Sequence, residues 1–247
     1  MSRQMLGENT FGPENVRAIT EGKPVTATMS YGGTIVKAAF FLALTIGFAT
    51  LGWRAAATVQ ASSGLWFFLG YLLLIGISIA AVGNPRLAAV AGLLYAVLMG
   101  LWMGSISRIY EAYYEGIVGQ AVLATVCVFA ACLFLYSFRV IRVTGRFVRF
   151  VLISLLGIGF MYLVGWLVSL FGIRLNFFYH PSGVGIGISL FIVLIAAFSL
   201  ILDFASIESG VKSGAPKAFE WYCAFALLST LVWLYLEVLR LLARTRR

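Results

Sequence analysis

The stretch DFASIESGVKSGAPKAFEWYCAFALLSTLVWLYLEVLR, residues 203–240, decides the fold. A long apolar run ends at Asp203, the only aspartate in the chain, and a second apolar run beyond a polar, glycine-containing segment carries Glu237. A carboxylate inside a lipid bilayer costs about 2.5–3.5 kcal/mol on insertion scales. Two such residues in consecutive apolar segments therefore indicate either a functional pair or helix ends that reach interfacial water.

The composition is that of an integral membrane protein. Of the 247 residues, 62% are hydrophobic and 11% are charged, and the mean hydropathy is +0.99, whereas soluble domains carry about 25% charged residues. The net charge of +9 comes from lysines and arginines in short loops and at the C-terminus. We therefore expect the lipid bilayer and its anionic headgroups as partners, and no nucleic acid.

Seven apolar runs predict an all-α fold, a polytopic membrane bundle of about seven transmembrane helices. Residues 1–30 are expected to form a cytosolic N-terminal tail and residues 31–247 the helical bundle. Most of the runs approach the length of about 20 residues that crosses a bilayer. They cover residues 34–52, 64–83, 87–106, 120–138, 150–171, 184–202 and 220–240. Gly100 and Gly104 in the third run have a GxxxG spacing, which mostly indicates close helix packing.

The loop charges predict which side of the membrane each end faces. With the N-terminus inside, Arg86 and the arginines of residues 139–149 also face the cytosol, in agreement with the positive-inside rule. A seventh full span would then place the basic C-terminus outside. Because the charge-free part of the last segment, Trp221–Leu236, has only about 16 residues, this segment either crosses inside the bundle or re-enters and returns.

Several charged residues have ordinary structural explanations. Lys37, in the first apolar run, is expected to reach the lipid headgroups. Glu208 and Glu220 flank the polar segment and are expected to be hydrated. Glu237 and Arg240 are three residues apart and can pair on one helix.

Intramembrane protease chemistry is not predicted, and we expect no enzyme and no cofactor. A serine nucleophile needs a histidine base on another element, but the only histidine, His180, lies two residues from Ser182. An aspartyl protease needs two aspartates that share a proton, and the chain has one. No combination of cysteines and histidine suggests a zinc site.

The chain resembles the Bax inhibitor-like family, most closely its bacterial branch with YccA-type proteins. The resemblance extends from about Met29 to Leu242, and its most specific part is the C-terminal motif. It rests on MSYGGTIVK at 29–37, GLWMGSI at 100–106, DFASIESGV at 203–211, GAPK at 214–217, EWY at 220–222 and LYLE at 234–237.

This resemblance implies a bundle of about seven helices in which the last is surrounded by the other six. Relatives behave as pH-sensitive calcium leak channels with two acidic residues as the sensor, and these fall on Asp203 and Glu237. The second acid is usually aspartate, so Glu237 departs from the pattern by one methylene group. An arginine of the second helix is thought to latch one acid in relatives, and Arg86 is the candidate here. Other relatives modulate membrane proteases or cell death.

We therefore expect a pH-sensitive cation leak channel, with calcium as the permeant ion, in a bacterial plasma (inner) membrane. Carboxylate oxygens suit calcium, so Asp203 and Glu237 are also candidate metal ligands. Gly210, Gly214 and Pro216 form a candidate hinge between the two acid-bearing segments. If the chain turned at Pro216, the two acids would be offset by about 12 Å along the helices. They would then either meet through an irregular connection or line one pathway at two depths.

A different class of function also fits the sequence. The alternative is a non-transporting regulatory protein that binds and modulates a membrane protease or another membrane protein through its polar N-terminal tail. A proton-coupled transporter of a small solute is a third hypothesis, which would require a polar central pocket.

Overall fold

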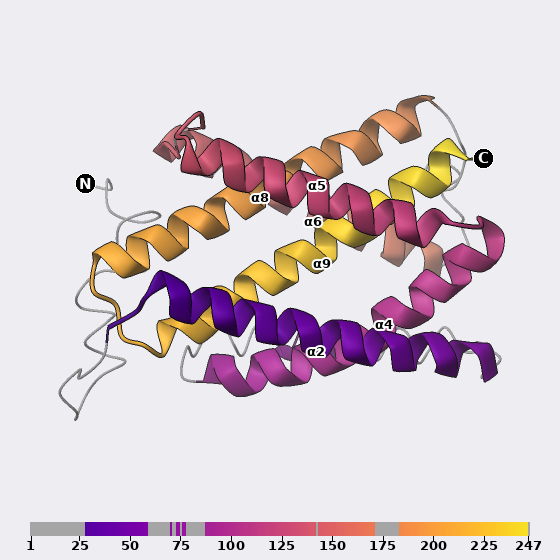
Figure 1. Ribbon diagram of the computed structural model, residues 1–247. Helices are drawn as coiled ribbons and strands as arrows, with labels where there is room; N and C mark the ends of the chain where they lie inside the picture. The colour runs from indigo at the N-terminus through magenta and orange to yellow at the C-terminus, as the bar shows by residue number, and fades with distance from the viewer. Residues whose placement is uncertain are drawn as a thin grey trace. The chain divides into compact units, whose positions relative to one another are not determined.

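The described part of the chain is mainly helical, with short turns between some of the helices (Figure 1). The computed structural model describes residues 28–58, 70, 73–74, 76–77, 87–141, 143–170 and 183–246. Within these residues the long elements are six α-helices, with no named strand. They are α2 (Tyr31–Thr58), α4 (Ala88–Tyr113), α5 (Ile117–Ser137), α6 (Gly145–Leu170), α8 (Gly183–Lys212) and α9 (Phe219–Thr245).

All six helices are long and apolar enough to cross a membrane. Their lengths run from 21 residues in α5 to 30 in α8, and large apolar side chains such as Leu123 and Leu156 remain exposed on their outer faces. Exposed apolar faces on apolar helices suit a lipid environment. The predicted all-α polytopic fold is confirmed. The second predicted run, residues 64–83, lies largely outside the described residues. The tail before Thr28 lies wholly outside them.

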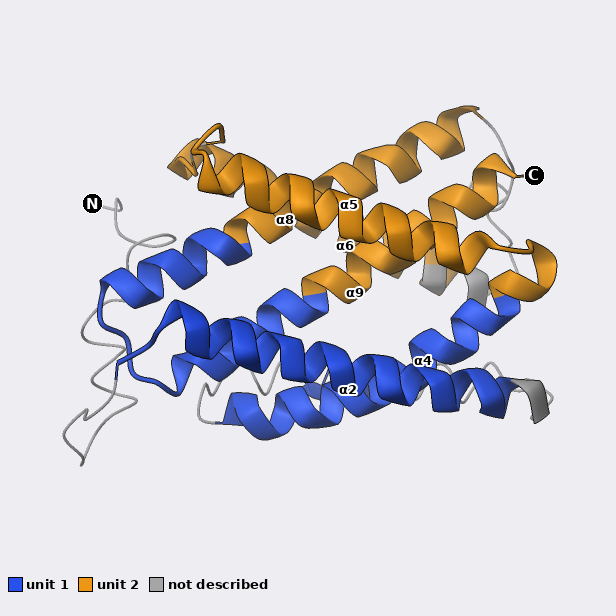
Figure 2. Cartoon of the chain, in the orientation of Figure 1, with its two compact units in different colours: residues 1–109, 203–229 blue, residues 110–202, 230–247 orange. Residues whose placement is uncertain are grey.

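The chain divides into two compact units (Figure 2). Unit 1 comprises residues 1–109 and 203–229, and unit 2 comprises residues 110–202 and 230–247. The division falls within α4, α8 and α9, so each of these helices contributes one part to each unit.

In unit 1, α2 and α4 pack with their backbones in close approach. A Cβ atom added at Gly104 would overlap the carbonyl oxygen of Ala49, and one added at Gly52 would overlap that of Leu101. The Ser105 hydroxyl also donates to the Gly52 carbonyl oxygen at 3.2 Å. The packing role predicted for the glycines of this run is therefore confirmed.

The connection between α8 and α9 is short and tightly bonded. Helix α8 continues past Asp203 to Lys212, so the break in helical structure is confined to residues 213–218. Gly214 has a φ of +65°. Its N–H donates to the Val211 carbonyl, while the N–H of Ala215 donates to that of Gly210 at 3.0 Å. These two bonds are the Schellman arrangement, which requires a left-handed residue after the helix.

In unit 2, the core lies between α6 and α8. Val151 and Ile158 of α6 are buried against Ile192 and Ile195 of α8. Cys132 of α5 completes this packing, since its thiol contacts the Ala197 carbonyl oxygen at 3.5 Å.

Helix α9 contacts helices of both units. In unit 1, Lys37 of α2 pairs with its first turn, and Tyr95 of α4 packs edge-on against Phe225. In unit 2, its other half contacts α5, α6 and α8. Half of its apolar window is buried, compared with 17% for α2. Helix α9 therefore takes part in the packing of each unit.

Helix α9 is also one continuous helix. Its 27 residues correspond to about 40 Å, more than the thickness of a bilayer core. A re-entrant hairpin is therefore not formed by residues 219–245, and the crossing alternative agrees with the structure.

Candidate functional site

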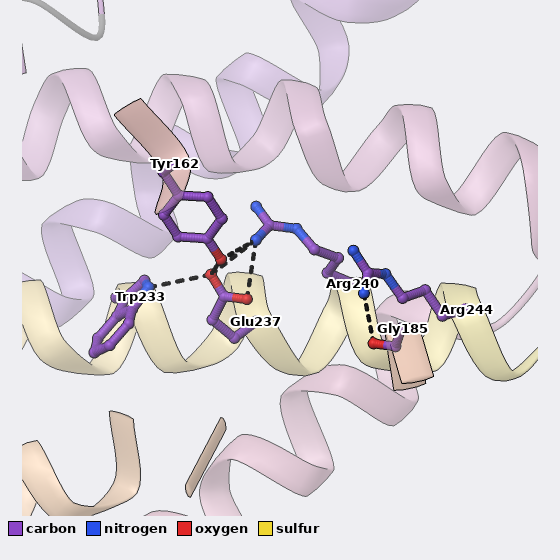
Figure 3. Close-up of polar contacts among 6 residues, drawn as sticks. All are labelled: Tyr162, Gly185, Trp233, Glu237, Arg240 and Arg244. Carbon is purple, nitrogen blue, oxygen red and sulfur yellow. Dashed lines mark hydrogen bonds and ion pairs between the residues drawn. The ribbon is translucent and has the colours of Figure 1, made fainter. Parts of the chain in front are cut away.

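Glu237 lies at the centre of a partly buried polar cluster in unit 2 (Figure 3). Only 1% of the residue is exposed. Its Oε1 atom accepts hydrogen bonds from the Tyr162 hydroxyl at 2.8 Å, the Trp233 indole N–H at 3.1 Å and the Arg240 guanidinium at 3.0 Å. Its Oε2 atom accepts a second bond from the same Nη1 of Arg240, at 3.0 Å. Every donor that a buried carboxylate needs is thus supplied by the protein.

Two elements build this cluster. Trp233 and Arg240 stand four residues before and three residues after Glu237, so all three side chains share one face of α9. Tyr162 comes from α6, where it borders the apolar core of unit 2. The guanidinium of Arg240 also donates to the Tyr162 hydroxyl oxygen and lies 5.2 Å from the centre of its ring. The cluster therefore joins α6 to α9.

The pairing of Glu237 with Arg240 makes the cluster neutral overall. The spacing of three residues predicted this pairing as the structural explanation for Glu237, and the pairing is confirmed. The arginine side chain is 37% exposed and the carboxylate only 2%. Removing the negative charge would leave the guanidinium without its counter-ion and weaken its hydrogen bonds, because only the donor would then carry a charge. The contact between α6 and α9 thus depends on the charge state of Glu237.

The basic end of α9 is bonded to the rest of unit 2. Arg244 donates to the Gly185 carbonyl oxygen at 2.6 Å (Figure 3). Arg246 donates to the Glu115 carbonyl oxygen and the Gln120 side-chain oxygen, both at 2.7 Å. The end of α9 therefore lies beside the α4–α5 turn and the start of α8.

Asp203 belongs to unit 1 and has its own surroundings. It is partly buried on α8 and lies within electrostatic range of the Tyr222 phenol and the Cys223 thiol of α9. The structure thus surrounds each predicted acid with specific neighbours inside its own unit. A direct pairing of Asp203 with Glu237 stays a prediction.

A third buried acid was not recognised as such in the sequence. Glu220 was expected to be hydrated, but it is fully buried, and its carboxylate forms an ion pair with Lys37. Lys37 was expected to reach the headgroups, but its ammonium group instead lies against Glu220 and 5.1 Å from the centre of the Trp221 ring. Both expectations were wrong because the two residues are 183 positions apart and no local pattern links them. Glu208 follows the ordinary explanation, as part of an exposed pair with Lys212.

The remaining predicted site residues have different outcomes. Arg86, the candidate latch, lies outside the described residues. Gly210 is inside α8, whereas Gly214 ends it and Pro216 forms an isolated antiparallel bridge with Thr28. In the described part of the chain, no three acidic, histidine or cysteine side chains come together as a metal site. Calcium binding by two carboxylates stays a prediction.

Comparison with known proteins identifies one family. The model of the family described as Bax inhibitor 1 like matches residues 5–247. No curated protein and no solved structure matches the chain significantly.

Proposed function

The chain belongs to the Bax inhibitor 1 like family, and from this premise we propose that it is a pH-sensitive cation leak channel, with calcium as the permeant ion. The observation that carries the proposal is the buried carboxylate of Glu237 in a membrane-spanning helix, bonded to Arg240 and Tyr162. An ionisable residue inside a membrane protein is expensive and is by default a functional site.

In the proposed mechanism, protonation of Glu237 weakens its bonds to Arg240 and loosens the contact between α6 and α9. Protonation of Asp203 would remove a negative charge from beside the Tyr222 phenol and the Cys223 thiol in unit 1. When deprotonated, Asp203 attracts cations, and its hard oxygen atoms suit calcium. Arg240 already contacts Glu237, so it can provide the counter-charge that the family resemblance assigned to Arg86.

The test is calcium flux into proteoliposomes, measured as a function of pH. We expect Asp203→Asn and Glu237→Gln each to change the flux and to flatten its pH dependence. Glu208→Gln is the matched control, because it neutralises an acid of α8 whose partner Lys212 is exposed to solvent. If both site variants keep the flux and pH response of the wild-type protein, the acids are not the sensor.

Wild-type protein that is folded but conducts no cation would favour the other class of function. The chain would then be a regulatory protein that binds a membrane protease or another membrane protein. Crosslinking in native membranes, with and without residues 1–28, would identify such a partner.

We further place the protein in a bacterial plasma (inner) membrane with its N-terminus in the cytosol. The supporting observation is the distribution of lysine and arginine over the loops, which satisfies the positive-inside rule up to the last helix.

A further inference from the structure

Three residues before α2 lie across the connection between the two acid-bearing helices. Thr28 forms the antiparallel bridge with Pro216, and the Met29 N–H donates to the Ala215 carbonyl oxygen at 2.8 Å. The N–H and hydroxyl of Ser30 both donate to Oε1 of Glu220, at 2.9 and 3.1 Å. This segment is thus bonded to the first turn of α9 as well as to the connection between the two helices.

The side chain of Met29 fills the space between those two helices. Met29 is 3% exposed and packs in one cluster with Ala215, Phe219 and Cys223. Its sulfur lies so close to α8 that a Cβ added at Gly210 would be 2.7 Å from it. Removing this side chain would therefore open a path to the buried thiol of Cys223.

The same side chain packs against the C-terminal part of the α8 face that carries Asp203. Asp203, Ile207 and Gly210 follow each other at spacings of four and three residues, which places them on one helix face. Ile207 packs against the Met29 cluster, and the Asp203 carboxylate is within electrostatic range of Cys223. The segment before α2 thus lies over the last turns of the α8 face on which Asp203 stands.

A buried ion pair holds this segment in place. The Glu220 side chain is 0% exposed and that of Lys37 is 14% exposed. The two residues stand on different helices, 183 positions apart. The site leaves no room for adjustment, because a Cβ at Gly33 would overlap the carboxylate. The stability of a desolvated ion pair requires both partners, since removing one leaves an uncompensated buried charge.

We propose that residues Thr28–Ser30 form a lid over the Asp203 face of α8, and that the Lys37–Glu220 ion pair keeps this lid closed. The inference rests on and deepens the proposed function, because the lid would control access of water and ions to Asp203. Opening the lid breaks the bonds of Ser30 to Glu220 and withdraws Met29 from its pocket.

The lid can be tested by the reactivity of Cys223 toward N-ethylmaleimide. The full-length protein, with Cys127→Ser and Cys132→Ala as background, would be purified in detergent and its labelling rate measured by mass spectrometry. We expect Glu220→Gln and Lys37→Met to label at least tenfold faster than the parent. Met29→Ala should also label faster, since it removes the covering side chain directly.

Two further variants make the result decisive. Lys212→Met is the matched control, because it breaks an exposed ion pair in the same unit, and its labelling rate should stay within twofold of the parent. The double variant Lys37→Met/Glu220→Gln removes both charges, so it leaves no unpaired buried charge that could prevent folding. Labelling within twofold of the parent in this folded double variant, while Met29→Ala labels faster, would overturn the proposal.

The labelling experiment does not depend on ion conduction. Absence of flux in the wild-type protein would refute the channel and leave the labelling result standing. If the protein does conduct, a tenfold faster labelling of Cys223 should be accompanied by a higher calcium flux in the same variant.

Discussion

The Tyr162 hydroxyl group is both a donor and an acceptor of hydrogen bonds, since it donates to Glu237 and accepts from Arg240. We predict that Tyr162→Phe destabilises the protein by about 1–3 kcal/mol, because it leaves buried polar groups with unmet hydrogen bonds. Arg240→Met should cost more, about 3–5 kcal/mol, because it leaves the buried carboxylate without a cation. Thermal unfolding in detergent, followed by circular dichroism, measures both. Tyr113→Phe is the control, because Tyr113 is 79% exposed.

The contacts between side chains that could be predicted from the sequence are those between neighbours on one helix. The pairing of Glu237 with Arg240 follows from their spacing of three residues. Tyr162, 75 positions from Glu237, and Lys37, 183 positions from Glu220, join their partners only through the packing of helices. Such contacts depend on which faces of two helices meet, and a single sequence contains no local signal for that choice.

At the scale of the helices, the structure assigns Gly214 to the termination of α8. With a φ of +65°, it ends α8 in a conformation that costs other residues about 1–2 kcal/mol. We predict that Gly214→Ala lowers the stability by about that amount and that Gly214→Asn lowers it less. Thermal unfolding of the two variants measures the difference. Equal stability of Gly214→Ala and wild type would contradict the strain argument.

The hypothesis that the α8–α9 connection is a hinge is best tested at Gly214 alone and not at Gly210 and Gly214 together. Gly210→Ala is not a clean stiffening variant, because its methyl group would meet the sulfur of Met29. Gly214→Ala changes only the connection, so its effect on the pH midpoint of calcium flux is the informative measurement. A shifted midpoint in the folded variant would support a hinge, whereas an unchanged midpoint would assign Gly214 to helix termination alone.

The positions of the helices were largely predictable, whereas their ends were not. The apolar runs located all six described helices, because about 20 apolar residues are needed to cross the bilayer. The sixth apolar run ends at Leu202 because hydropathy falls at Asp203, yet the polar sequence beyond it remains helical up to Lys212. Helix termination follows backbone geometry at Gly214 rather than the loss of apolar residues.

At the scale of the whole molecule, the contacts of Arg246 place the end of α9 beside the α4–α5 turn. We predict that cysteines introduced at Arg246 and at Glu115, in a cysteine-free background, react with membrane-impermeant thiol reagents from the same side of intact cells. Gly145→Cys, in the arginine-rich loop assigned to the cytosol, should resist those reagents. Ready labelling at Gly145 would invert the assigned orientation, and labelling of Arg246→Cys and Glu115→Cys from opposite sides would contradict the crossing of α9.

The neutral pair of Glu237 and Arg240 also has an electrical consequence. A helix segment whose opposite charges cancel experiences almost no net force from the membrane potential. If Glu237 takes up a proton, the charge of Arg240 is no longer balanced, and its displacement through the full potential is worth about 2.3 kcal/mol per 100 mV. Under the proposed function, acidification would therefore make α9 sensitive to voltage, and a conductance that is ohmic at alkaline pH would become rectifying at acid pH.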